Sequence, residues 1–215
     1  MSLQTQLDAR RADFNQKAPQ TTKDAYQRGI ESVVDSGMLA QAKNQGDLAI
    51  DFTLSNAQGQ PVSLKEYLEQ GPVVLTWYRG GWCPYCNITL RELQQSLPAF
   101  KAEGANLLAL TPELPDKSIS TQEKNELKFE VLTDQGNEIA RKYGLVFKLT
   151  PEVSELYRKN LSLEEYNGNG SDELPLAATY VIDRQGLIQF AFLDAEYRHR
   201  AEPNQIIQTL QSLRY

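Results

Sequence analysis

The fold is decided by one apolar stretch, Val73-Val74-Leu75-Thr76-Trp77-Tyr78, which is rich in β-branched and aromatic residues. A continuous run of this kind is typical of a strand that is buried on both faces of a sheet. Helical periodicity follows from Pro84 to about Lys101, and a second buried strand is predicted from Asn106 to Leu110. Strand, helix and strand in this order form a βαβ unit, so we expect the two strands to be parallel.

The C-terminal part of the chain predicts the rest of the sheet. Two strand-like segments, 178–183 and 187–192, flank a turn at residues 184–186, which indicates a hairpin. A last helix is predicted from about Pro203, with its apolar residues on one face. A βαβ unit followed by ββα is the order of a thioredoxin-like α/β fold, in which helices flank a central mixed sheet.

The remaining segments suggest an extension and a domain. Residues 1–45 have helical spacing that is broken at Pro19, so we interpret them as an N-terminal helical extension. It is expected to pack on the domain or on a second subunit, which makes a homodimer a hypothesis. Residues 46–215 form the thioredoxin-like domain. It is predicted to contain strands at 49–54 and 62–64, a helix capped by Ser63, a polar helix at 120–126 and an irregular loop at 150–175.

Composition excludes several classes of protein. Of the 215 residues, 40% are hydrophobic and 23% are charged, which is typical of a globular chain and not of a disordered, collagenous or coiled-coil one. The net charge of −6 makes nucleic acid and anionic membranes poor partners. No apolar run reaches the ~20 residues of a membrane span, and the polar start lacks a secretory signal, so we expect a cytoplasmic protein.

The two cysteines of the chain lie in one motif, Trp82-Cys83-Pro84-Tyr85-Cys86. Cys83 falls where the predicted helix begins, and the unpaired N–H groups there favour a thiolate, with a pKa lowered to about 3.5–7.5. Arg79 could add positive charge. Cys86 follows one turn later on the apolar stripe of the helix. We therefore expect Cys83 to be the exposed attacking thiol and Cys86 to be the shielded resolving thiol.

A Cys-x-x-Cys pair has two other interpretations. It could supply half of a zinc site, but zinc takes four ligands and the only histidine in the chain is His199. It could be a structural disulfide, but it would close too small a loop to stabilise the fold much. We favour a redox pair in a reducing compartment, which requires no metal and no organic cofactor.

Other side chains near the motif carry weaker signals. Trp82 either shields the thiols or simply packs, and Tyr85 is expected at the surface. His199 lies between Arg198 and Arg200, so we expect a solvated basic patch. Pairing of His199 with a cysteine stays open.

Several motifs together resemble one family. The chain is similar to the alkyl hydroperoxide reductase/thiol-specific antioxidant (AhpC/TSA) family, and more narrowly to its peroxiredoxin-like branch, over about residues 46–213. The resemblance implies a thioredoxin fold and thiol-based reduction of hydroperoxides. It rests on these segments: Asp51-Phe52-Thr53-Leu54, Tyr78-Arg79-Gly80-Gly81-Trp82-Cys83-Pro84-Tyr85-Cys86-Asn87, Val131-Leu132-Thr133-Asp134, Ala140-Arg141-Lys142-Tyr143-Gly144 and Thr179-Tyr180-Val181-Ile182-Asp183.

The chain also departs from the family pattern. Thr76 and Gly80 stand where typical peroxiredoxins have the Pro and Thr that precede the attacking cysteine, and Ala177 stands where they have an Arg. Substrate binding or thiolate stabilisation must then come from other groups. We name Arg79, Trp82, Thr76 and the backbone N–H groups around Cys83. The Cys-Pro-Tyr-Cys motif itself resembles that of glutaredoxins.

The predicted function is that of a peroxiredoxin-like thiol oxidoreductase. The Cys83 thiolate attacks a hydroperoxide, and Cys86 closes an intramolecular disulfide that an external thioredoxin- or glutathione-type system reduces. Two alternatives remain open. One is a thiol-disulfide oxidoreductase without significant peroxidase activity, and the other is a non-enzymatic redox-sensing module that acts through residues 150–175.

Overall fold

A computed structural model describes residues 2–213. Its elements are the helices α1 (Leu3–Lys17), α2 (Gln20–Asp35), η1 (Met38–Ala40), α3 (Leu64–Gln70), α4 (Pro84–Ala102), α5 (Pro115–Lys124), η2 (Gln135–Asn137), α6 (Glu138–Lys142), α7 (Pro151–Asn160), α8 (Leu163–Asn167) and α9 (Pro203–Ser212), and the strands β1 (Thr53–Ser55), β2 (Pro61–Ser63), β3 (Val73–Trp77), β4 (Asn106–Thr111), β5 (Glu130–Thr133), β6 (Val146–Lys148), β7 (Glu173–Pro175), β8 (Thr179–Ile182) and β9 (Ile188–Phe192).

The central sheet has the strand order β5-β4-β3-β8-β9. Strands β3, β4 and β5 are parallel, while β8 pairs antiparallel with both β3 and β9. In register, Thr76 lies opposite Ala109 on one side and Thr179 on the other. The predicted mixed sheet and its C-terminal hairpin are confirmed.

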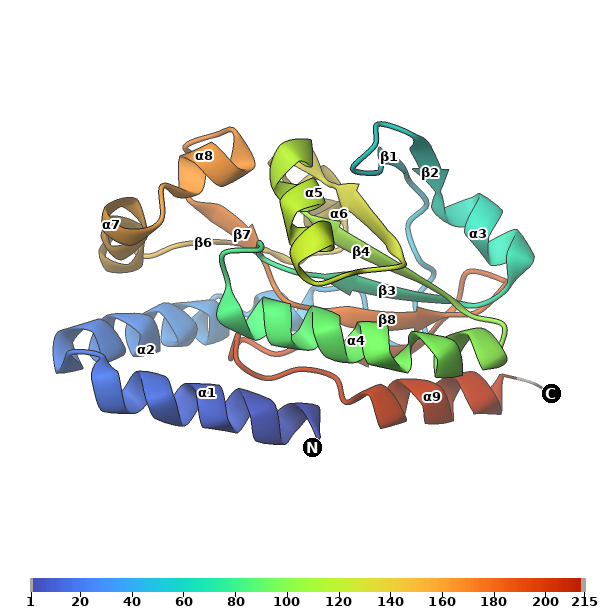
Figure 1. Cartoon of the computed structure of the whole chain (residues 1–215), viewed down its shortest axis with the longest axis horizontal. Coiled ribbons are helices and arrows are strands. Elements are labelled where there is room, and N and C mark those ends of the chain that lie inside the picture. The colour runs from blue at the N-terminus through green and yellow to red at the C-terminus, as the bar shows by residue number, and fades with distance from the viewer. Residues whose placement is uncertain (1, 214–215) are drawn as a thin grey trace.

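Every residue of β3 is buried because helices cover both faces of the sheet (Figure 1). Val74 faces the core that α4 and α9 build, and Leu75 and Trp77 face the opposite core. Helix α1 contacts α4, and its residues Leu3 and Leu7 join the first core. The N-terminal helices therefore pack on the same chain. None of the helices in residues 2–213 has the length and apolar character needed to cross a bilayer.

Two predicted segments were wrong. The expected strand at 49–54 pairs only over Thr53–Ser55, because the backbone N–H and C=O of Ile50 both bond to the hydroxyl of Tyr143 instead of to a neighbouring strand. The expected irregular loop at 150–175 contains α7, α8 and β7. Pro151 begins α7, and Val153 and Tyr157 form its buried face, one helical turn apart.

Helix boundaries are otherwise close to expectation. The predicted cap is present, since the Ser63 hydroxyl accepts the N–H of Glu66 at 3.4 Å. The polar helix expected at 120–126 lies earlier, at Pro115–Lys124, where Pro115 occupies the first turn. Helix α4 continues through Pro98.

Candidate functional site

Cys83 lies at the N-terminus of α4, just beyond the carboxyl end of β3. It is the N-cap residue, with extended backbone angles, and Pro84 occupies the first helical turn. The free N–H groups and positive dipole of a helix start favour an anion at this place. The structure thus confirms the predicted position of the motif between the first central strand and its helix.

The guanidinium of Arg79 lies directly against Cys83. Its Nη2 donates to the Cys83 Sγ at 3.3 Å, and its Nη1 donates to the hydroxyl of Tyr157 at 3.2 Å. The guanidinium carbon also lies 4.2 Å from the ring centroid of Tyr197 and 5.1 Å from that of Trp82. Arg79 is buried, so these contacts hold its charge in a medium of low dielectric.

A second arginine, which the sequence analysis placed in a solvated patch, lies against Cys86. Arg200 is 5% exposed, and its Nη2 is 3.6 Å from the Cys86 Sγ. Its other bonds go to the backbone carbonyls of Tyr197 and His199. Arg198 is also buried and pairs with Glu196. The predicted solvated basic patch is therefore wrong for both arginines.

The pKa values of the two thiols are shifted in opposite directions. Burial by itself raises the pKa of Cys83, but the hydrogen bond from Cys86 and the charges of Arg79 and Arg200 bring it well below its ordinary value. For Cys86, burial, the hydrogen bond to Cys83 and the negative charge of Cys83 raise the pKa well above the ordinary value. The reduced site therefore favours the thiolate form at Cys83 and the protonated form at Cys86.

The predicted exposure of Cys83 is wrong. Its exposed fraction is 0%, because aromatic side chains from distant segments cover it. Trp82 and Tyr157 meet edge to face at 5.2 Å, and Tyr26 of α2 packs on both Tyr157 and Tyr197. Trp82 thus both packs and shields.

Tyr85 is also buried, contrary to expectation. Its ring meets Tyr197 edge to face at 5.7 Å. An aromatic residue inside the motif is therefore part of the cover and not of the surface.

The loop before Cys83 is anchored from the end of β4. The buried Glu113 accepts the N–H of Gly81 at 2.8 Å, and the amide of Asn87 donates to the Gly81 carbonyl at 2.7 Å. A side chain at Gly81 is excluded, because its Cβ would lie 1.9 Å from Oγ1 of Thr121. This packing fixes the backbone that leads into Cys83.

Trp82 also explains a departure from the family pattern. Gly80 has φ +153°, and a Cβ there would lie 2.1 Å from Nε1 of Trp82. The indole therefore fills the space that the side chain of a Thr at position 80 would need. Arg79 is the side chain that reaches the sulfur in its place.

The other predicted residues lie apart from the thiols. The Thr76 hydroxyl bonds to the carbonyl of Ala178 and the hydroxyl of Thr179, so it is used within the sheet. His199 pairs with Asp194 at 2.8 Å and bonds to neither cysteine among residues 2–213. Its predicted alternative as a cysteine partner finds no support.

Sequence reasoning missed Arg200, Tyr157, Tyr197, Tyr26 and Glu113. Each lies far from the motif along the chain and comes near it only in the folded chain. The one available signal was α7, whose helical spacing from Val153 to Tyr157 was overlooked inside the predicted loop.

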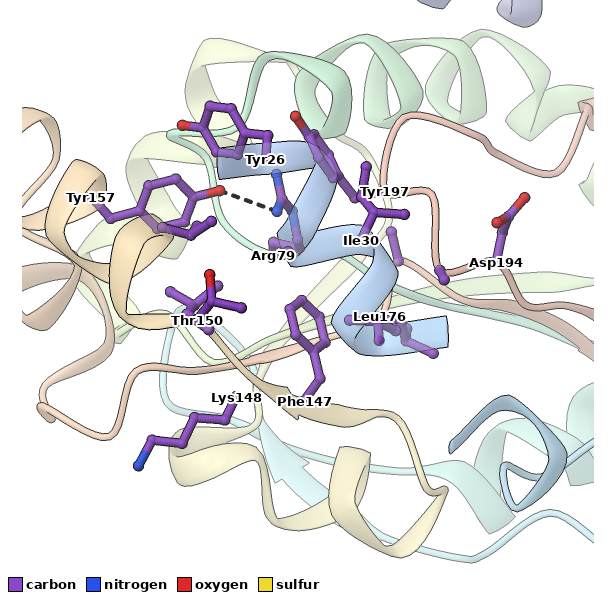
Figure 2. A pocket seen from close by; sticks show the side chains of 16 residues that line it. Tyr26, Ile30, Arg79, Phe147, Lys148, Thr150, Tyr157, Leu176, Asp194 and Tyr197 are labelled. Carbon is purple, nitrogen blue, oxygen red and sulfur yellow. Dashed lines mark hydrogen bonds between the residues drawn. The ribbon is translucent and has the colours of Figure 1, made fainter. Parts of the chain in front are cut away.

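A mostly apolar cavity of about 30 Å³ lies beside Arg79 and is lined by residues of α2 and α7. Figure 2 shows the side chains that line it. Tyr26, Tyr157 and Tyr197 surround the guanidinium there, and Phe147 and Leu176 line the apolar end. A second, wider hollow of about 230 Å³ reaches Arg79 past Trp82 and Pro84. Arg79 and the same three tyrosines line both cavities.

Comparisons with known proteins point to one family. A sequence model of the AhpC/TSA family matches residues 45–191. The chain is 25% identical over 170 residues to peroxiredoxin Q, chloroplastic, of Sedum lineare, a match that covers 79% of each chain. It is 28% identical over 102 residues to the thiol-disulfide oxidoreductase ResA of Bacillus thuringiensis, covering 47% of this chain and 58% of that one.

Solved structures agree on the fold. Peroxidoxin BcpB of Mycobacterium tuberculosis superposes with a TM-score of 0.63 at 19% identity, over 80% of this chain and 99% of that one. A peroxiredoxin Q of Xanthomonas campestris superposes with a TM-score of 0.59 at 15% identity, over 75% and 90%. Both support the thioredoxin-like architecture described above.

Proposed function

The chain belongs to the AhpC/TSA family, and from this membership and the site we propose that it is a thiol-dependent peroxidase. The observation that carries the proposal is the position of Cys83. Its sulfur lies at a helix N-terminus, 3.3 Å from Nη2 of Arg79, with a second thiol one helical turn away. The positive charge of Arg79 beside the sulfur favours the nucleophilic thiolate at neutral pH.

In the first step the Cys83 thiolate attacks the terminal oxygen of a hydroperoxide. A sulfur–oxygen bond forms, the O–O bond breaks, and its electron pair leaves on the alkoxide, which takes a proton to become an alcohol. Cys83 becomes a sulfenic acid. The guanidinium of Arg79 lies where the negative charge passes from sulfur to oxygen, so it can stabilise both ends of the transfer.

In the second step Cys86 attacks the sulfenic sulfur. The Cys83–Cys86 disulfide forms, the S–O bond breaks, and the hydroxide that leaves takes a proton to become water. An external thiol reductant of the thioredoxin or glutathione type then supplies two electrons and restores both thiols.

The substrate is expected to reach the sulfur through the hollows at Arg79. The Nε of Arg79 is buried and has no hydrogen-bond partner among residues 2–213, so it can donate to a peroxide oxygen. Because Cys83 itself is fully covered, the aromatic side chains over it must shift as the substrate enters.

The test mixes reduced protein with a stoichiometric hydroperoxide. Tryptophan fluorescence follows the reaction, and intact mass shows the loss of two hydrogens. We expect fast formation of the Cys83–Cys86 disulfide in the wild type, no reaction in Cys83→Ser, and a stable sulfenic acid in Cys86→Ser. Equal consumption of peroxide by the wild type and Cys83→Ser would refute the proposal.

Thiol-disulfide exchange is the second candidate, favoured by the Cys-Pro-Tyr-Cys motif and by the similarity to a thiol-disulfide oxidoreductase. The same two thiols would then attack and resolve a disulfide in place of a peroxide. Slow reaction with every hydroperoxide together with fast exchange with a small disulfide would select it.

A further inference from the structure

The redox site contains two buried positive charges, and no carboxylate of residues 2–213 pairs with them. Arg79 is 4% exposed and Arg200 is 5% exposed. Within residues 2–213 neither arginine forms an ion pair with Asp or Glu. Instead each guanidinium has one cysteine sulfur as a partner, Cys83 for Arg79 and Cys86 for Arg200. A buried charge without a counter-ion is costly, so the sulfurs must supply the compensation.

Arg200 is held in place independently of the sulfur. Its Nη1 donates to two backbone carbonyls, those of Tyr197 and His199, just before α9. Carbonyl oxygens orient the guanidinium but do not neutralise its charge. The full positive charge of Arg200 therefore remains directed at Cys86.

The charge of the site changes with its redox state. In the reduced site one thiolate, Cys83, compensates one of the two arginines. In the disulfide both sulfurs are neutral, and both guanidiniums are left without a counter-ion. Positive charge at Cys86 therefore stabilises the reduced pair relative to the disulfide.

The positive charge of Arg200 also affects the resolving step, in which Cys86 attacks the oxidised Cys83. While Cys83 is a thiolate, its charge and its hydrogen bond keep Cys86 protonated. Both effects disappear once Cys83 is a sulfenic acid. Burial then still raises the pKa of Cys86, and the charge of Arg200, which lies 3.6 Å from Sγ in the reduced site, opposes that rise. The charge of Arg200 thus favours loss of the Cys86 proton at this stage, which gives the thiolate that attacks the sulfenic sulfur as described above.

We propose that Arg200 is the positioning residue of Cys86. Its positive charge stabilises the Cys86 thiolate for the resolving step, and it makes the Cys83–Cys86 disulfide easier to reduce than it would be without that charge. This inference rests on the proposed function for the resolving step, but its effect on the dithiol–disulfide equilibrium does not. A readily reduced disulfide suits an enzyme that an external thiol must return to the dithiol state.

The test equilibrates the protein with reduced and oxidised glutathione and measures the oxidised fraction by mass after acid quenching. In Arg200→Gln, which keeps hydrogen-bond donors but loses the charge, we expect the equilibrium to shift toward the protein disulfide by tenfold or more. A tenfold shift is about 30 mV for this two-electron couple. Arg200→Lys, which keeps the charge, should stay within about threefold of the wild type.

The matched control is Arg198→Met, which removes another buried arginine of the same segment, one that pairs with Glu196 and touches neither sulfur. It should leave the equilibrium within about threefold of the wild type. If Arg200→Gln does not fold, Arg200→Met takes its place. A shift below tenfold in the folded neutral variant, or an equal shift in Arg198→Met, overturns the proposal.

Peroxide takes no part in this equilibrium, so the two proposals fail separately. A protein that does not reduce hydroperoxides can still show the shift, which supports the role of Arg200 in the couple. An active peroxidase whose equilibrium is unchanged in Arg200→Gln refutes only the role of Arg200.

Discussion

At the scale of single residues, Arg79 takes the place of the Thr that the family pattern has near the attacking cysteine. Where the family pattern has a Thr, this chain has Gly80, and the indole of Trp82 occupies the space. Arg79, which precedes that glycine, reaches the sulfur from the loop itself and is fixed by the Tyr157 hydroxyl and the Tyr197 ring. A rigid planar guanidinium can therefore supply the donor that the missing Thr would have supplied.

Arg79→Met should raise the pKa of Cys83, because the thiolate loses both a positive charge and a hydrogen bond. A lowered pKa keeps the wild-type thiol ionised to lower pH than an ordinary cysteine, so the variant's titration curve should lie at higher pH. The reaction with hydroperoxide should slow roughly ten- to hundredfold, from the ~1.5–3 kcal/mol of a charged hydrogen bond. Thiolate absorbance against pH measures the first effect, and stopped-flow fluorescence measures the second.

The control for this prediction is Arg184→Met. Arg184 is exposed, and its only described hydrogen bond is to the Glu69 carbonyl, so the control should match the wild type in both measurements. Unchanged thiol ionisation in Arg79→Met would contradict the role assigned to Arg79.

At the scale of elements, the loop between β3 and α4 depends on the end of β4. Glu113 follows β4 and accepts the N–H of Gly81, while Thr121 of α5 donates to its second oxygen at 3.4 Å. Burial raises the pKa of Glu113, and the hydrogen bonds to the carboxylate oppose the rise only in part. Glu113, which holds the active-site loop, is therefore ionised less readily than an exposed glutamate.

Glu113→Gln should reveal this through the pH dependence of stability. The glutamine oxygen can still accept from Gly81, but the side chain does not ionise. Because the folded-state pKa of Glu113 lies above that of the unfolded chain, the wild type loses free energy of unfolding relative to the variant as pH rises through the folded pKa. Urea unfolding from acidic to neutral pH measures the difference, and parallel curves for the two proteins would contradict it.

At the scale of the whole molecule, segments from both ends of the chain complete the site. Figure 1 shows α1 and α9 beside α4, on one face of the sheet. Leu3 and Leu7 belong to the same core cluster as both cysteines. The apolar residues of α1, which could have packed on a second subunit, thus pack on α4 of the same chain. A homodimer stays a prediction, which sedimentation of the purified protein tests.

Leu7→Ala should destabilise the protein by about 3 kcal/mol, since Leu7 is 1% exposed and truncation leaves a cavity between α1 and α4. The free energy of unfolding in urea measures the loss. Val34→Ala is the comparison, because Val34 is 55% exposed and should change stability by less than about 0.5 kcal/mol. A loss below about 1 kcal/mol in Leu7→Ala would mean that α1 does not pack on α4 in solution.

The sequence by itself determined the sheet and the reacting pair. The continuous apolar run of β3 predicts a buried strand from its own residues, and a Cys-x-x-Cys motif at a helix start is recognisable because its spacing and helix position are local properties. Tertiary structure alone decided that Cys83 is covered, that Tyr157 holds Arg79, and that Arg200 faces Cys86. These contacts join residues separated by up to 114 positions, and burial of a charge depends on what packs around it rather than on its neighbours in the chain.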